Sequence, residues 1–143
     1  MTELIMNSKA YEYATDCVDK NNRNVGRYVK KQCQIFLDAL KDDSEYYIDE
    51  NEFKALCSFL KLINIMPGKN AYENLAGFQW FFITNVLCLR KKSNNLRRYS
   101  LSIMLIARKQ GKTMLSGLIF LLLMLLSDPR SEFYSVARFQ IEN

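Results

Sequence analysis

The chain has 143 residues, of which 49% are hydrophobic and 24% charged; this is the composition of a globular protein and excludes an intrinsically disordered one. Its 20 Lys and Arg residues against 15 Asp and Glu give a formal net charge of +5, which is compatible with nucleotide or nucleic-acid partners without requiring them. The absence of histidine excludes Ser-His-Asp and Cys-His nucleophile systems and histidine-ligated zinc within the chain.

The first half of the chain is predicted to be helical. Ser8 can cap a first helix, residues 27–40 carry an apolar stripe at helical spacing, and Asp49 with Glu52 resembles the capping box of a further helix. A Pro-Gly pair then ends that helix. We therefore predict a helical N-terminal subdomain over residues 1–68.

A further helix is predicted over residues 76–89, followed by a basic segment. Gln79 stands at the start of this helix, where a lone glutamine is ordinarily a surface residue. Residues 90–98 hold five basic side chains in nine positions. Such a run is usually solvated, and contact with nucleic-acid phosphates is the sharper alternative.

The last third of the chain changes its hydrophobic period. Residues 101–106 are typical of a strand, 112–127 of a helix that is apolar all round, and 131–137 of a second strand. This order predicts a right-handed parallel β-α-β crossover. The fold class is therefore predicted to be α/β: a helical N-terminal region followed by the first β-α-β unit of a P-loop NTPase domain, which begins near residue 69, runs to residue 143 and has an incomplete sheet.

The turn between the first strand and the helix has the sequence Ala-Arg-Lys-Gln-Gly-Lys-Thr, over residues 107–113. It is typical of a phosphate-binding loop, except that Ile106 stands where the first glycine is expected. Lys112 would reach the β- and γ-phosphates, and Thr113 would offer its hydroxyl to Mg²⁺. A simple helix start, with a permissive glycine and solvated lysines, is the alternative. It does not explain why cations gather between two apolar elements. The candidate site is Arg108, Lys109, Gln110, Gly111, Lys112 and Thr113.

The order of these signals resembles the start of the large subunit of tailed-bacteriophage terminase, the motor that packages DNA into procapsids. The resemblance is carried by Phe-Gln-Trp at 78–80, the loop at 107–113, the apolar helix after it, and Glu-Phe-Tyr-Ser-Val-Ala at 132–137. Gly-Arg-Tyr-Val-Lys at 26–30 also fits, so the resemblance extends from about Ser8 to about Gln140. Phosphate loops of that family are typically degenerate at the first glycine.

The resemblance implies an ATPase with ATP and Mg²⁺ as cofactors, followed in the family by a nuclease domain. It assigns Lys112 and Thr113 to the phosphates and Mg²⁺, and Arg108 or Lys109 to added charge on the triphosphate. Gln79 would match the glutamine that reads adenine, with a neighbouring aromatic residue near the base. The implied partners are double-stranded phage DNA, the portal and the terminase small subunit, in the cytoplasm of a bacterial host.

Two acidic features of that family are not found. Hydrolysis there needs a strand ending in Asp-Glu, and the acidic residues after the loop, Asp128, Glu132 and Glu142, do not follow an apolar strand in that way. The nuclease cluster is also missing. We therefore expect an amino-terminal fragment that binds ATP without hydrolysing it or cutting DNA, and that is prone to self-association or homo-oligomer formation. The alternatives are a small interaction protein acting through its helical region and a nucleic-acid-binding protein acting through the basic segment.

Membrane and disulfide roles are not favoured. The first residues show no secretory signal, and the apolar run from Met114 to Leu126 is 13 residues long against the roughly 20 that a spanning helix needs. The cysteines form no Cys-x-x-Cys pair and sit in apolar helical patterns, which indicates buried free thiols in a reducing compartment. They are Cys17, Cys33, Cys57 and Cys88.

Overall fold

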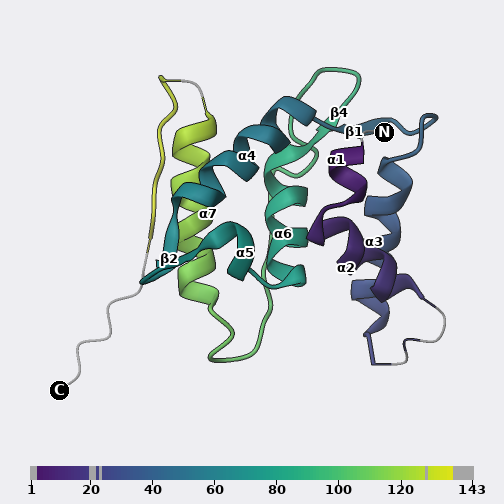
Figure 1. The fold of residues 1–143 in the computed structure, drawn as a ribbon. Helices are drawn as coiled ribbons and strands as arrows, with labels where there is room; N and C mark the ends of the chain where they lie inside the picture. The colour runs from purple at the N-terminus through teal and green to yellow at the C-terminus, as the bar shows by residue number, and fades with distance from the viewer. Residues whose placement is uncertain (1–2, 20–21, 23, 128, 137–143) are drawn as a thin grey trace.

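The computed structural model describes residues 3–19, 22, 24–127 and 129–136. In chain order its elements are α1 (Glu3–Met6), α2 (Lys9–Val18), α3 (Arg27–Ala39), β1 (Tyr46–Ile48), α4 (Glu50–Leu62), β2 (Asn64–Met66), β3 (Lys69–Asn70), α5 (Ala71–Asn74), α6 (Gly77–Cys88), β4 (Leu89–Lys91) and α7 (Lys112–Leu126) (Figure 1). It is a mixed α and β protein in which helices dominate and the strands form small antiparallel sheets.

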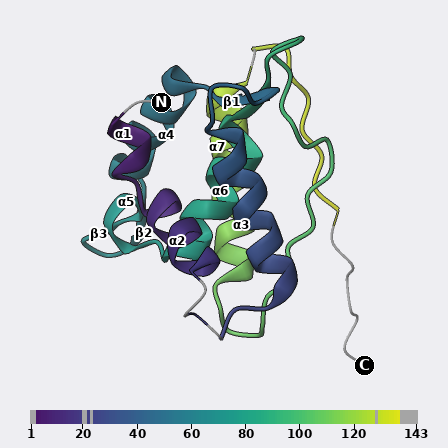
Figure 2. The ribbon, with the colours of Figure 1, turned by 90° about the vertical axis from the view of Figure 1, so that its right-hand side faces the viewer.

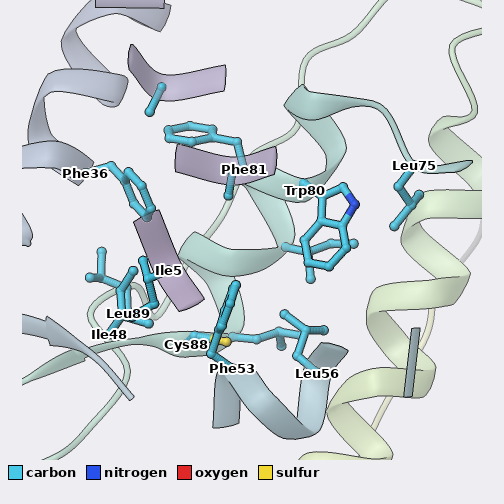
Figure 3. Packing of buried hydrophobic residues seen from close by; sticks show 14 of the residues in the cluster. Ile5, Phe36, Ile48, Phe53, Leu56, Leu75, Trp80, Phe81, Cys88 and Leu89 are labelled. Carbon is cyan, nitrogen blue, oxygen red and sulfur yellow. The ribbon is translucent and has the colours of Figure 1, made fainter. Parts of the chain in front are cut away.

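Helix α6 is the centre of the packing. It lies between α7 on one side and the α2–α3 pair on the other (Figures 1 and 2). Gly77 allows α2 to approach closely, because a Cβ at this position would lie 3.1 Å from the Cβ of Tyr13. The rings of Phe36 and Phe81 meet edge to face with centroids 5.3 Å apart (Figure 3). The predicted boundary at residue 68 falls in the turn between β2 and β3, and elements from both sides of it pack together.

Two of the predicted helix starts are confirmed by their caps. The Ser8 hydroxyl accepts the Tyr11 N–H at 3.3 Å, and the Asp49 carboxylate accepts the Glu52 N–H at 3.1 Å. The capping box is half formed. The Glu52 carboxylate does not return to the Asp49 N–H, which donates to the Cys88 carbonyl at 2.9 Å, but pairs with Arg90 instead.

Two short antiparallel pairings were not predicted from the sequence. Strand β1 pairs with β4, with Tyr46 opposite Lys91 and Ile48 opposite Leu89. Strand β4 therefore begins the predicted basic segment and ties it to α4 through β1. Strands β2 and β3 form a small hairpin whose turn contains Gly68 at a φ of 70°.

The predicted parallel β-α-β crossover is not formed by the described residues. The predicted helix is confirmed as α7. Neither residues 101–106 nor residues 131–136 form a strand, and residue 137 lies outside the described part of the chain. The physical reason is that a parallel strand depends on hydrogen-bonded neighbours and on helices covering both faces of its sheet. An apolar alternation alone does not supply these.

Helix α7 is buried on one face only. Leu115, Leu118 and Leu122 join the core through this face, and Phe120 meets the ring of Phe133 at 5.9 Å between centroids. Other apolar side chains of the last third are exposed to solvent, Leu105 at 93% of its surface. The exposed set is Leu101, Ile103, Leu105, Leu121, Met124, Leu125, Tyr134 and Val136, and we call it the apolar face.

Candidate functional site

The candidate site is the loop that enters α7. Gly111 occupies the N-cap position with φ of 72° and ψ of 22°, in the left-handed region that glycine adopts at little cost. Lys109, two residues before it, also has a positive φ of 64°. The Gly111 carbonyl accepts the Leu115 N–H at 2.8 Å, so the helix begins directly after the glycine.

The first turn of α7 has backbone N–H groups without hydrogen-bond acceptors in the helix. Its N-cap residue is glycine, no side chain of the described residues caps this helix, and none of its first turn is acidic. A helix start leaves its first N–H groups without intrahelical acceptors, and the macrodipole adds partial positive charge at the same place. The start of α7 therefore has the backbone chemistry of an anion-binding site.

The cationic side chains of the loop are exposed to solvent and lack carboxylate partners among the described residues. The Arg108, Lys109 and Lys112 side chains form no ion pair with any carboxylate of the described residues. Gln110 and Thr113 are also exposed. Lys112 in addition lines a cavity of about 390 Å³ beside α6, whose other walls include Phe82 and Ser116. The predicted loop residues are therefore brought together at one solvent-facing end of α7.

Gln79 lies beside this loop. It is buried, with 7% of its surface exposed, so its interpretation as a surface residue is wrong. Its Oε1 accepts the Ala76 N–H at 2.9 Å, completing a capping interaction at the start of α6. Its Nε2 has no acceptor among the described residues, and a Cβ at position 111 would lie 3.3 Å from it. The fold thus joins Gln79 to the glycine of the loop.

The aromatic residue after Gln79 lies elsewhere. Trp80 is buried in the core (Figure 3). Its ring meets that of Tyr72 at 5.3 Å between centroids, and its Nε1 donates to the Tyr72 carbonyl at 3.2 Å. Its position is explained by packing between α5 and α6.

The basic segment is largely bound to the protein itself. Arg90 donates from Nε to Glu52 at 2.9 Å and from a terminal nitrogen to the other carboxylate oxygen, and this carboxylate raises the pKa of the guanidinium. Arg97 lies 3.9 Å from the same carboxylate, and Arg98 stacks over the Tyr46 ring at 3.7 Å. These contacts fasten the segment to α4 and β1. These contacts leave no local signal in the sequence, because their partners lie far apart in the chain.

The described residues hold no group of three or more acidic or cysteine side chains arranged to bind a metal ion. Glu132 is exposed and accepts the Tyr134 hydroxyl at 2.6 Å, while Asp128 and Glu142 lie outside the described residues. The cysteines are free thiols, and burial raises the pKa of Cys33 to about 12. None of the helices in the described ranges is long and apolar enough to cross a membrane.

Comparisons of the chain with protein-family models, with curated proteins and with solved structures found no match. The features that bear on function are therefore the loop before α7, its cations and the buried glutamine beside it.

Proposed function

We propose that this chain binds ATP at the loop before α7, and that it is part of the ATPase of a tailed-phage terminase large subunit, the motor that packages double-stranded DNA. The observation that supports this most is the left-handed Gly111 at an uncapped helix start. Free N–H groups and the positive end of the helix dipole favour a polyphosphate at such a position.

The side chains around the glycine suit the same ligand. In this proposal Lys112 contacts the terminal phosphates, while Arg108 and Lys109 add positive charge around the triphosphate. Gln110 completes the loop between them. The exposure of these three cations without carboxylate partners in the described residues supports the proposal. Charge-assisted hydrogen bonds to phosphate oxygens are about twice as strong as neutral ones.

Thr113 fits the role of a magnesium ligand. It is the second residue of α7 and is exposed beside Lys112, and its hydroxyl makes no hydrogen bond to any described residue. Mg²⁺ prefers oxygen ligands and is commonly held by one or two protein groups together with substrate phosphates. Bound there with ATP, it would neutralise charge on the β- and γ-phosphate oxygens.

We further propose that this chain binds ATP without hydrolysing it. By resemblance, hydrolysis needs an Asp-Glu pair at the end of an apolar strand, which the 143 residues do not show. The described carboxylate nearest after α7, Glu132, is exposed and bonded to the Tyr134 hydroxyl. Measurable ATP turnover by the purified chain would contradict this part of the proposal.

An interaction protein is the second candidate function, and the apolar face favours it. Leu105 is 93% exposed and Val136 is 97% exposed, and large apolar side chains left open to solvent in such numbers favour a protein contact. A second copy of the chain is one such contact, and the portal or the small subunit of the packaging machinery are others. Nucleic-acid binding through residues 90–98 is the third proposal, and the contacts of Arg90, Arg97 and Arg98 leave it fewer free cations.

The test is a calorimetric titration of the full chain with Mg·ATP, beside Lys112→Ala and Lys54→Ala. Lys54 is exposed on α4, so the control makes the same chemical change away from the loop. Loss of a charged phosphate contact should weaken binding roughly 10-fold or more in Lys112→Ala alone. Equal affinities in all three proteins, or no binding at all, would contradict the proposal. Binding to a protein partner that survives Lys112→Ala would support the second candidate.

A further inference from the structure

The position of Gln79 bears on which part of a nucleotide this site recognises. We propose that the Nε2 of Gln79 binds the phosphate chain and not the base, so that the site takes nucleoside triphosphates as a class. This inference rests on the proposed function, because it concerns the same loop. It differs from the adenine-reading role that the family resemblance implies for this residue.

The amide of Gln79 has one end fixed and the other free. Its Oε1 accepts the Ala76 N–H at 2.9 Å, and the side chain is enclosed by protein, with 7% of its surface exposed. This bond fixes which way the amide points. Its Nε2 carries two protons and has no acceptor among the described residues. Both of its protons are therefore available to a ligand, and a hydrogen bond to an ionised acceptor is stronger than one to a neutral group.

The free end points at the phosphate end of the proposed site. The Nε2 lies 3.3 Å from the Cβ position of Gly111, the residue directly before the first turn of α7. The unpaired N–H groups of that turn would hold the phosphates. In a nucleoside triphosphate the base is separated from the terminal phosphates by the ribose and the α-phosphate. A donor beside Gly111 is therefore next to phosphate oxygens.

Recognition of adenine would require a different arrangement of the Gln79 side-chain amide. A glutamine recognises adenine in a bidentate manner, with its oxygen accepting from the exocyclic amine and its nitrogen donating to a ring nitrogen. In this chain the oxygen already accepts the Ala76 N–H with one of its two lone pairs and is held at the start of α6, so the donor is the freer end of the amide. A lone donor suits a phosphate, which carries acceptors and no donors when ionised, and the charge strengthens the bond.

Two variants separate the cap from the ligand contact. Gln79→Glu keeps an oxygen for the Ala76 N–H, because glutamate serves equally in a capping box, but it replaces the free donor with a negative charge. Gln79→Ala removes both. Gln34→Glu makes the matched charge change on α3, where Gln34 is exposed and donates to Asp38 at 3.1 Å. Thermal melts of all the variants report whether the fold is kept.

The experiment titrates the full chain with Mg·ATP, Mg·GTP and inorganic tripolyphosphate with Mg²⁺. We expect all three to bind, and Gln79→Ala to weaken each by the same factor, roughly 10- to 100-fold for a hydrogen bond to a charged group. Gln79→Glu should weaken all three further while melting like the wild type, and Gln34→Glu should bind like the wild type. A loss confined to ATP in the Gln79 variants, or a wild type that binds ATP alone, would overturn the inference and leave the proposed function standing. If the wild type binds none of the three, both fail together.

Discussion

Replacing Gly111 by alanine perturbs the loop at its most constrained residue. Its φ of 72° is left-handed, which costs a residue with a Cβ about 1–2 kcal/mol. Loss of unfolded-state freedom offsets about 0.4–1 kcal/mol of this. The new Cβ would also lie 3.3 Å from Nε2 of Gln79 and 3.5 Å from Cε of Met114, so Gln79 must shift. We expect Gly111→Ala to lower the free energy of unfolding by about 1 kcal/mol and to weaken Mg·ATP binding about 10-fold.

Gly68→Ala is the matched control. Gly68 has nearly the same φ, 70°, but nothing lies within 4 Å of its Cβ position. Both variants should therefore show similar strain, about 1 kcal/mol, which lowers the melting temperature by roughly 3 °C in a domain of this size. Urea denaturation gives the stability of each variant, and calorimetric titration gives its affinity for Mg·ATP.

The two variants together decide between local and global effects. If Gly68→Ala loses as much affinity as Gly111→Ala, the loss reflects stability and not the loop. If Gly111→Ala matches the wild type in both stability and affinity, the left-handed glycine and its contact with Gln79 are not features of the folded protein, and the reasoning fails.

Three further predictions concern the fold that supports the site. Leu60→Ala, at a fully buried position, should cost about 2–5 kcal/mol in urea denaturation, while Leu62→Ala, at a position 77% exposed, should stay within about 0.5 kcal/mol; similar losses would contradict the described core. Glu52→Gln removes the carboxylate bound by Arg90, whose side chain is 18% exposed, and should cost about 1–3 kcal/mol in the same assay, whereas unchanged stability would show that the pair contributes nothing. Burial raises the pKa of the Cys33 thiol from 9.0 to about 12, so between these pH values the native state keeps a proton that the unfolded chain releases. The contribution of this thiol to the free energy of unfolding is complete below pH 9.0 and is lost as the pH rises towards 12. Cys33→Ala should flatten that alkaline decline, and an unchanged pH profile would refute the assignment.

Sequence reasoning predicted the parts of the fold that depend on local signals. Ser8 and Asp49 are caps that accept from backbone N–H donors within three residues, and the start of α7 follows Gly111 as expected. The pairing of β1 with β4 could not be read in this way. It brings Tyr46 opposite Lys91, and such a register is set by the tertiary packing of α4 and α6 and not by either strand alone.

The predicted strands failed for a related reason. The alternation over residues 101–106 is compatible with a strand, but its residues face solvent on one side and pair with no neighbour among the described residues. Strand formation is a property of a sheet, and an alternating segment without a partner stays extended and unpaired. The apolar face is the consequence.

The candidate site also has a part set by local sequence and a part set by tertiary packing. Residues 107–113 are contiguous, so their spacing alone predicted the glycine turn, the cations and the helix after them. Gln79 was assigned to the site only by resemblance, because its approach to Gly111 depends on how α6 packs beside α7. Its buried amide and its engaged oxygen could not be inferred from a glutamine that follows an aromatic residue.

Amide hydrogen exchange with and without saturating Mg·ATP can locate a bound nucleotide on the chain. We expect slower exchange in peptides that cover Gly111 to Leu115, because the phosphates would accept hydrogen bonds from the first turn of α7. A smaller protection is expected at the start of α6, and none over residues 90–98. No protection at the start of α7, or protection confined to residues 90–98, would contradict a nucleotide site at this loop.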